Sequence, residues 1–184
     1  ADDRSDEVDN VKDLTDDEND AYRSQITNLK NEALNHIDDQ TTDDGVTREK
    51  EAGINKIEQV NIVPVIKPNA RQTINEKANE QKQKIQQDRI ATQEEKDAAK
   101  QKVDQAVTEA KANISTAVTN SNVDTASTTG VNNINAVTIE VVKKAQARKA
   151  IDDAATAKKA TIDQTPDATQ EEKEAAKQKV DQAV

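Results

Sequence analysis

The sequence contains no cysteine, methionine, tryptophan or phenylalanine, and Tyr22 is the only aromatic residue among its 184. A globular enzyme of this length normally buries several aromatic side chains, because they supply the largest apolar areas. Without cysteine, neither disulfides nor thiolate metal sites can form, and this fits the cytosol and the outside of a cell equally. The composition therefore gives little support to an enzyme core and does not fix the compartment.

Basic charge and long apolar runs are also scarce. There are 36 acidic and 26 basic residues, which gives a net charge of −10, and the isoelectric point is about 4.7. Nucleic acids and anionic membrane surfaces bind basic stripes, so we expect neither as a partner. No apolar run approaches the roughly 18 residues that a membrane span needs, and we expect no membrane contact by this segment.

Low hydrophobicity with a high net charge is also typical of disordered chains. The mean hydropathy is −0.99. Against disorder, Val, Ile, Leu and Ala recur at helical spacing, while three Gly and three Pro are too few for a flexible linker. We therefore expect a folded helical chain, with a disordered solvating segment as the less favoured alternative.

A repeat of 77 residues organises the chain. The stretch 91–107 returns as 168–184, a displacement of 77, with a single difference between Asp97 and Glu174. A fixed period without insertions is the signature of a tandem repeat. Further pairs at the same offset are Thr15 and Thr92, Gly53 and Gly130, Ile57 and Ile134, and Arg71 and Arg148.

The repeat predicts how the chain is divided. Residues 1–13 are the tail of a preceding repeat, 14–90 and 91–167 are three-helix repeats, and 168–184 are the truncated first helix of the next repeat. We expect a segment of a longer array, in which each unit is stabilised by its neighbours.

Each unit is predicted to contain three helices. The first helix begins at a Thr-x-x-Glu capping box, found at Thr15, Thr92 and Thr169, and it carries an apolar stripe of about 25 residues. The second helix follows the polar cluster 119–122, and the matching stretch 43–45 is predicted to break the helices of the first unit.

The third helix covers about residues 70–85 in one unit and 147–162 in the next. Before it, Pro64 and Pro68 keep the connection of the first unit extended. Three amphipathic helices bury their apolar faces only against one another, which predicts an all-α fold of tandem three-helix bundles.

The junctions between units are predicted to differ. Thr165-Pro166-Asp167 interrupts the helix, whereas 86–90 contains no breaker, so a nearly continuous helix is expected from about residue 70 to 118. Such helices would join the bundles end to end as an elongated rod, with two units spanning on the order of 80 Å.

Few side chains are candidates for a chemical site. His36 is the only histidine, and we expect it on the solvated helix surface. Four acids lie around one loop: Asp38, Asp39, Asp43 and Asp44. These acids raise the alternative of a calcium site. If Gly45 were the conserved glycine of a calcium-binding loop, the first ligand position would fall on Gln40, which is not an acid. The matching loop 119–122 of the next repeat has no acids at all. We predict no catalytic, cofactor-binding or metal-binding residues, and no enzyme activity.

Three other features have structural interpretations. Tyr22 is expected to fill core space near one end of a bundle, with ligand binding as the alternative. Gly53 and Gly130 indicate close helix approach or a bend, because Gly costs about 1 kcal/mol against Ala inside a helix. Arg71 and Arg148 are expected to be solvated, although a repeated arginine could also form a ligand stripe along a rod.

Several separated motifs occur in the order of a known repeat. They are Ala-Thr-Gln-Glu-Glu-Lys-x-Ala-Ala at 91–99 and 168–176, Asn-Val-Asp-Thr-Ala at 122–126, Gly-Val-Asn-Asn-Ile-Asn at 130–135 and Thr-Pro-Asp-Ala-Thr at 165–169. They resemble the domain-of-unknown-function repeat of staphylococcal cell-wall-anchored surface proteins of the extracellular matrix-binding (Ebh/Embp), FmtB and SasC type. The resemblance covers essentially the whole chain in the repeat frame.

The resemblance implies an extracellular, cell-wall-attached bacterial segment that takes part in adhesion, biofilm formation and virulence. The first hypothesis is a non-catalytic stalk or spacer that projects an adhesive region. The alternative is a weak multivalent module that binds fibronectin or another host matrix protein, or that self-associates between cells. The fragment is expected to be monomeric and to need no cofactor, and the family supplies no binding residues to carry over.

Overall fold

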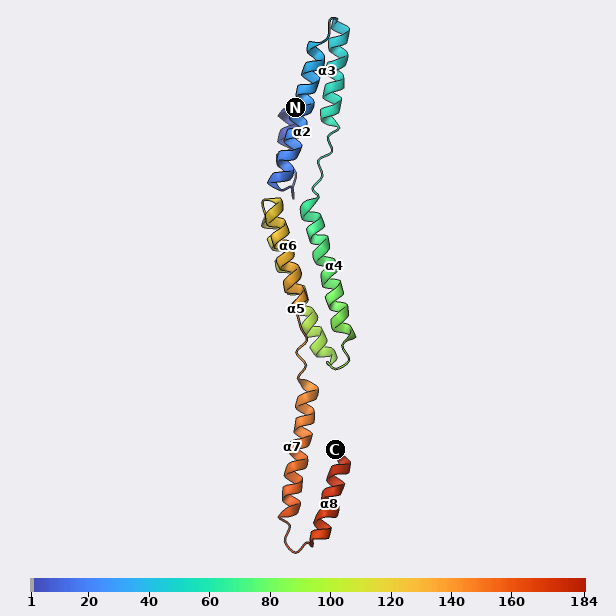
Figure 1. Ribbon diagram of the computed structural model, residues 1–184, viewed down its shortest axis with the longest axis vertical. Helices are drawn as coiled ribbons and strands as arrows, with labels where there is room; N and C mark the ends of the chain where they lie inside the picture. Colours follow the sequence, from blue (N-terminus) through green and yellow to red (C-terminus); the bar gives the residue numbers. More distant parts are fainter. Residues whose placement is uncertain (1) are drawn as a thin grey trace. The chain divides into compact units, whose positions relative to one another are not determined.

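The computed structural model describes residues 2–184, and within that range the regular structure is entirely helical (Figure 1). Ala1, which belongs to the predicted tail 1–13, lies outside the described residues. The helices are α1 (Asp2–Asn10), α2 (Asp16–Asp38), α3 (Asp43–Glu58), α4 (Ile66–Gln87), α5 (Gln93–Thr116), α6 (Asn120–Asn135), α7 (Lys143–Asp163) and α8 (Gln170–Ala183). The all-α prediction is confirmed.

The chain forms two compact units. The first contains the chain up to Lys82 together with Lys102–Val137, and the second contains Gln83–Gln101 together with Thr138–Val184. The first unit therefore holds α1, α2, α3 and α6 with most of α4 and α5. The second holds α7 and α8 with the turn that joins α4 to α5.

In the first unit, α2 packs against both α1 and α3. Their shared core is built from Val8, Ile26, Ile57 and Val60. Tyr22 packs against this cluster, and its hydroxyl donates to the carbonyl of Val63 at 3.0 Å and accepts from the Val63 N–H at 3.2 Å. Core filling by Tyr22 is thus confirmed, and its hydroxyl also ties down the chain that leads to α4.

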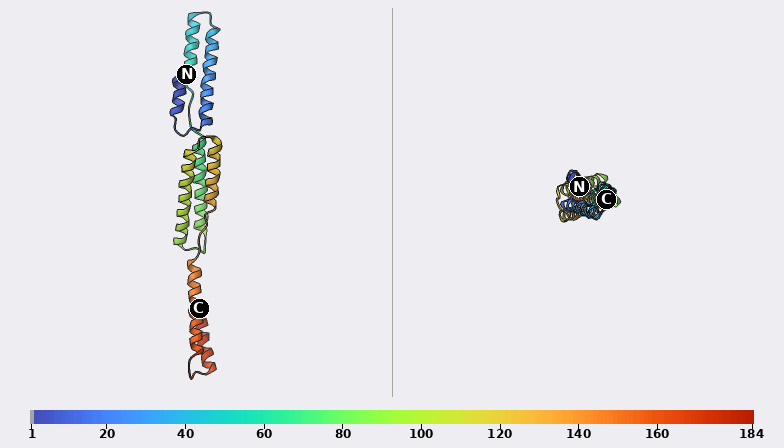
Figure 2. Two further views of the ribbon diagram at one scale, coloured as in Figure 1. Left: turned by 90° about the vertical axis from the view of Figure 1, so that its left-hand side faces the viewer. Right: turned by 90° about the horizontal axis from the view of Figure 1, so that it is seen from above.

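The helices α4, α5 and α6 lie side by side (Figures 1 and 2). A Cβ atom added to Gly130 on α6 would lie 2.5 Å from Cβ of Ala110 on α5 and 2.8 Å from Cδ1 of Ile74 on α4. On α3, the same atom added to Gly53 would lie 2.5 Å from Cβ of Ala33. Real Cβ atoms do not approach so closely, so the prediction that these glycines permit close helix approach is confirmed.

The expected continuous helix from about residue 70 to 118 is wrong. Helix α4 ends at Gln87 and α5 begins at Gln93. Between them, Oδ1 of Asp88 accepts the N–H groups of Ile90 at 2.8 Å and Ala91 at 2.7 Å, which closes an Asx-type turn. The chain needs no Gly or Pro to turn here, because the side chain of Asp88 replaces the next helical hydrogen bonds.

The stretch 43–45 was expected to break a helix, but it forms the first turn of α3 instead. Its N-cap is Thr42, whose hydroxyl accepts from the Gly45 N–H at 3.1 Å. The break between α2 and α3 lies at residues 39–42.

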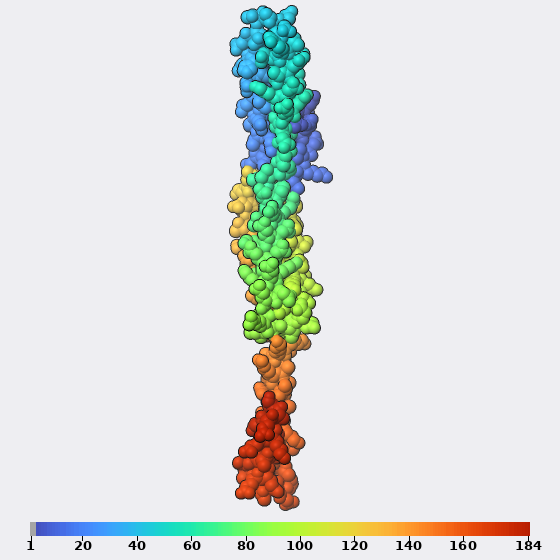
Figure 3. All heavy atoms as spheres, turned by 90° about the vertical axis from the view of Figure 1, so that its right-hand side faces the viewer, coloured from blue at the N-terminus to red at the C-terminus, as the bar shows by residue number. Residues whose placement is uncertain are grey.

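The connection 59–65 is non-helical, as expected of Pro64, and it lies between the cyan and green helices (Figure 3). The expectation for Pro68 is wrong, because Pro68 lies in the first turn of α4, where a helix tolerates proline.

In the second unit, α7 and α8 form an antiparallel pair (Figure 1). The predicted interruption at Thr165-Pro166-Asp167 is confirmed, because α7 ends at Asp163 and α8 begins at Gln170. Asp167 adopts a positive φ of 62°, a conformation that Asp tolerates better than most residues.

The packing joins the third helix of one predicted unit to the first two helices of the next. Gly130 of α6 contacts α5 and α4, although α4 falls in the predicted unit 14–90 and the other two helices in 91–167. A repeated sequence fixes a period but not a starting point, and only packing selects the helices that share a core. The boundaries at 14, 91 and 168 remain a prediction about how the array is divided.

Candidate functional site

Polar side chains that bond between different helices gather where α2 begins. They form what we call the junction cluster, which consists of Asp13, Thr15, Asp17, Glu18, Lys67, Arg71, Ser115 and Asn120. All of them belong to the first unit. The cluster connects the start of the α1–α3 group with the α4–α6 group.

The cluster is built on a capping box. Thr15 is the N-cap of α2, and its hydroxyl accepts from the Glu18 N–H at 3.2 Å, while Oε2 of Glu18 accepts from the Thr15 N–H at 3.0 Å. Such a box satisfies helix donors that would otherwise lack a partner. The prediction of helix starts from the Thr-x-x-Glu pattern is confirmed here and at the other two copies, where α5 follows Thr92 and α8 follows Thr169.

The other oxygen of the same glutamate caps a second helix. Oε1 of Glu18 accepts the N–H groups of Val65 at 2.8 Å and Ile66 at 3.1 Å, at the start of α4. One carboxylate therefore closes α2 through one oxygen and α4 through the other. The position before α4 is a valine, which has no side-chain acceptor of its own.

The arrangement recurs one repeat later, within the second unit. Oε1 of Glu95 accepts from Val142 N–H at 2.8 Å and Lys143 N–H at 2.9 Å, at the start of α7, while Oε2 accepts from Thr92 N–H at 2.8 Å. Val142 makes no side-chain cap. Glu18 thus ties α2 to the start of α4, and Glu95 ties α5 to the start of α7, through N–H groups 47 and 48 residues further on.

The first turn of α2 also closes α6. Oδ2 of Asp17 accepts the Asn120 N–H at 2.7 Å, and the Thr15 hydroxyl donates to Oδ1 of Asn120 at 2.6 Å. Thr15 is only 1% exposed. Since helix N-termini carry partial positive charge, acids placed at three of them are stabilising. The acidic turn of α2 serves the starts of α2, α4 and α6 together.

Two cations of α4 complete the cluster at the end of α5. Both oxygens of Asp13 accept from the guanidinium of Arg71 at 2.8 Å, and Arg71 also donates to Oγ of Ser115 at 2.9 Å. Nζ of the buried Lys67 donates to the Ser115 carbonyl at 3.3 Å. Cations are favoured at a helix C-terminus.

The expectation that Arg71 is solvated is therefore wrong, because a bidentate carboxylate holds it. Its copy Arg148 is exposed, as expected. The position equivalent to Asp13 in the next repeat is Ile90. Arg71 therefore has an acidic partner, Asp13, whereas Ile90 at the equivalent position offers Arg148 none.

Hydrogen bonding shifts the pKa values of the capping glutamates. Donation from the N–H groups of Lys143, Thr92 and Val142 lowers the pKa of Glu95 to about 2. Burial raises the pKa of Glu18, but the N–H groups of Thr15, Val65 and Ile66 outweigh that effect and leave the pKa below its ordinary value. Glu172 has a lowered pKa through its bonds from Thr169 alone. A lowered pKa means that the hydrogen bonds favour the ionised carboxylate.

His36 and the acids around residues 38–44, which the sequence suggested as candidates for a chemical site, do not belong to this cluster. His36 is about half exposed, and its Nδ1 lies 3.5 Å from Oε2 of Glu49 on α3. Within residues 2–184, no three His, Asp or Glu side chains are placed so that they could hold a metal ion, and this includes the acids around residues 38–44. Among the helices of this described range, none has both the length and the apolar character of a membrane span.

The second hydrogen-bonding role of Glu18 and Glu95 was not predicted. The available signal was an absence, since α4 and α7 follow valines rather than Ser, Thr, Asp or Asn. Such a helix needs a cap from elsewhere in the fold. Sequence spacing alone does not show that the carboxylate which accepts from the start of this helix lies 47 residues earlier.

Comparisons with known proteins cover the whole chain. The sequence model of the family described as Domain of Unknown Function (DUF1542) matches residues 1–65, 66–142 and 143–184. The second and third matches begin at the first residues of α4 and α7 and keep the same period.

A curated relative is the extracellular matrix-binding protein ebh of Staphylococcus aureus (strain MW2). It is 26% identical over 178 residues, which cover 97% of this chain but only 2% of that protein. The chain thus spans a very small part of the relative's length. No solved structure matches the chain.

Proposed function

Because the chain belongs to the DUF1542 family of tandem repeats, we propose that it is a non-catalytic spacer segment of a bacterial surface protein, one that holds an adhesive region at a distance from the cell wall. The proposal places the segment outside the cell and in a supporting role in adhesion and biofilm formation. The name of the relative, an extracellular matrix-binding protein, supports a surface location.

The repeated double cap of Glu18 and Glu95 is the observation that supports this role. Each carboxylate uses both oxygens on backbone N–H groups of two helices. A spacer requires each repeat to be fixed to the next one, and a shared cap does this with the same residue in each copy. In a ligand-binding surface, by contrast, we would expect such carboxylates to be free to contact the ligand, whereas here both oxygens already accept from backbone N–H groups.

Small-angle X-ray scattering tests the spacer role directly. We expect the fragment to scatter as a monomeric, elongated particle, as the predicted rod of end-to-end bundles requires. Replacing Glu18 and Glu95 together by alanine should shorten or broaden the distribution of interatomic distances, because the shared caps are lost. Replacing Glu94 and Glu171, which provide neither shared cap, is the matched control. A compact particle, or two variants that scatter alike, would contradict the proposal.

A second candidate function is weak multivalent binding to matrix protein, which the name of the relative favours. Single repeats would bind weakly, and many repeats would add their contributions through effective concentration. Titration of immobilised fibronectin with the fragment, together with sedimentation of the fragment alone, separates the candidates. Saturable binding or self-association at micromolar concentration would favour the binding module over a pure spacer.

A further inference from the structure

Residues 137–142 lead from α6 to α7 without regular secondary structure (Figure 1). The carbonyl of Val137 accepts from Nε2 of Gln81 at 2.7 Å, and the N–H of Val142 donates to Oε1 of Glu95 at 2.8 Å. Between these two ties, residues 138–141 make no hydrogen bond within the described part of the chain. Their backbone N–H and C=O groups are therefore available to another molecule.

Glu140 is the one charged residue of this connection, and it is exposed. Among the residues that the structure describes, every other glutamate lies within a helix. An endoprotease binds its substrate as an extended strand, so that backbone hydrogen bonds give affinity and pockets for side chains give selectivity. A helix has to open locally before it can bind in this way. Only Glu140 presents a glutamate side chain on backbone that is already open.

We propose that the peptide bond between Glu140 and Val141 is a cleavage site for a glutamate-specific endoprotease. In the reaction a water molecule adds across this bond. The C–N bond breaks, the water oxygen remains on the carbonyl carbon of Glu140 as part of a new carboxylate, and Val141 gains a free amino group. The cut divides the chain between α6 and α7. This inference goes beyond the spacer role and does not depend on it, since it uses the connection and neither capping glutamate.

The equivalent bond one repeat earlier, between Val63 and Pro64, is protected in three ways. Val63 carries no carboxylate. Its carbonyl accepts from the hydroxyl of Tyr22 at 3.0 Å, and its N–H donates to the same oxygen at 3.2 Å, so both backbone groups are already occupied. Pro64 has no N–H to offer. In the next repeat Ala99 takes the position of Tyr22 and cannot form these bonds.

The two connections are otherwise held alike. Val65 donates its N–H to Glu18 at 2.8 Å, just as Val142 donates to Glu95. The contrast between a protected and an unprotected bond therefore depends on three repeat positions, which are occupied by Tyr, Val and Pro in one copy and by Ala, Glu and Val in the other.

The test is limited digestion of the full chain, under native conditions, with a glutamate-specific endoprotease, followed over time by mass spectrometry. We expect the first cut after Glu140, at least about tenfold faster than any cut after a helical glutamate, because cleavage follows the population of open backbone. Glu140→Gln should abolish this cut and leave the circular dichroism unchanged. Glu58→Gln, at the exposed last residue of α3, is the matched control and should leave the rate unchanged. A first cut after a helical glutamate would overturn the proposal.

A transfer of the site to the first connection tests why the second is sensitive. The triple variant Tyr22→Phe, Val63→Glu and Pro64→Val keeps the ring that packs on the core and changes an exposed valine. We expect it to gain a second cut, after position 63, at a rate within about tenfold of the cut after Glu140. Val63→Glu alone, with the tyrosine and the proline in place, should stay uncut there. A folded triple variant without the new cut, or a single variant that is cut equally fast, would overturn the proposal.

Discussion

At the scale of single residues, the smallest side chains decide how closely the helices approach. Gly53 lies against Ala33 and Gly130 against Ala110, so each pair brings two helix backbones together where larger residues would hold them apart. The contact is with a Cβ atom, which cannot rotate away as the end of a long side chain can. Close packing of this kind compensates for a core that contains neither phenylalanine nor tryptophan.

Gly130→Ala should therefore destabilise the chain, although alanine favours helices by about 1 kcal/mol over glycine. The new methyl group would lie 2.5 Å from Cβ of Ala110, and overpacking typically costs about 1–3 kcal/mol. We expect a net loss of about 1 kcal/mol in urea denaturation followed by circular dichroism.

Gly45→Ala is the matched control for this substitution. Its nearest neighbour would be Oε1 of Gln40 at 2.6 Å, the far end of a flexible side chain that can move aside. We expect this variant to remain within about 0.5 kcal/mol of the parent. If Gly130→Ala were as stable as the parent, close approach would not be the reason for the glycine.

Thr15→Ala should cost about 1 kcal/mol of unfolding free energy, because the N-cap of α2 is lost. The substitution also leaves Oδ1 of the Asn120 side chain without the donor that it has at 2.6 Å. Thr15→Ser keeps the hydroxyl and should retain most of the stability in the same denaturation experiment. Equal losses from the two substitutions would show that packing, and not the hydroxyl, makes Thr15 important.

At the scale of helices, local sequence patterns predicted which segments are helical, and they predicted some helix ends correctly but missed others. The capping boxes at Thr15, Thr92 and Thr169 marked three helix starts correctly, since the whole motif lies within four residues. The turn after α4 was missed because Asp88 replaces the Gly or Pro that normally signals a break. Short-range chemistry is visible in a sequence, but a turn closed by a single acid resembles an ordinary helix surface.

The junction cluster was largely beyond prediction for a related reason. The carboxylate of Glu18 and its partners at the start of α4 are 47 and 48 residues apart in sequence. Arg71 and Asp13 are separated by 58 residues. Only the packing of the helices brings such groups together, so the repeat could show that these residues recur but not what they contact.

The shared cap of Glu95 predicts a dependence on acid. Its folded pKa of about 2 lies below the ordinary value of 4.5. The cap therefore stabilises the start of α7 fully above about pH 4.5, and this stabilisation is lost as the pH falls toward the folded pKa. Hydrogen exchange of the Lys143 amide, followed by NMR between about pH 5 and pH 2.5, should show protection that decreases with acid.

Glu95→Gln should lower that protection at about pH 5 and remove most of its change with pH, because the amide does not ionise. Glu174→Gln is the matched control, since its carboxylate accepts from the side chain of Gln170 and does not cap α7. This control should follow the parent profile. An unchanged profile in Glu95→Gln would mean that other acids control the start of α7.

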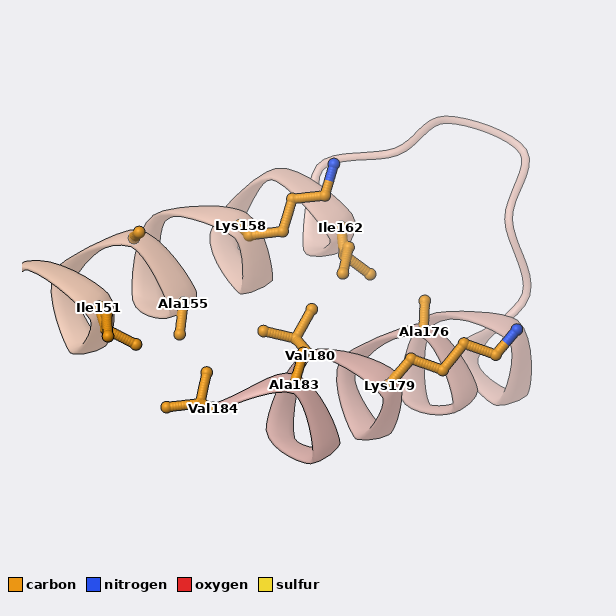
Figure 4. A pocket seen from close by; sticks show the side chains of 10 residues that line it. Ile151, Ala155, Lys158, Ile162, Ala176, Lys179, Val180, Ala183 and Val184 are labelled. Atoms are coloured by element: carbon orange, nitrogen blue, oxygen red, sulfur yellow. The ribbon is translucent and has the colours of Figure 1, made fainter.

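At the scale of the whole molecule, equivalent positions of the repeat differ in exposure between the two units. In the first unit, α6 covers Ile74, whereas in the second unit its counterpart Ile151 lies in a groove between α7 and α8 (Figure 4). The same comparison holds for Val103, which is buried, and Val180, which is partly exposed. Because hydrophobic stabilisation follows the apolar area removed from water, equivalent residues should contribute unequally.

The two units should therefore unfold at different denaturant concentrations, with α7 and α8 first. Ile74→Ala should cost about 2–5 kcal/mol, the usual range for truncating a fully buried isoleucine. Ile151→Ala should cost less than about 1 kcal/mol, because that side chain is half exposed. Hydrogen exchange read by mass spectrometry assigns each transition to its helices, so that each loss is measured on its own unit. A single transition shared by all helices, or equal losses from the two substitutions, would show that α7 and α8 gain stability from a source other than a third helix.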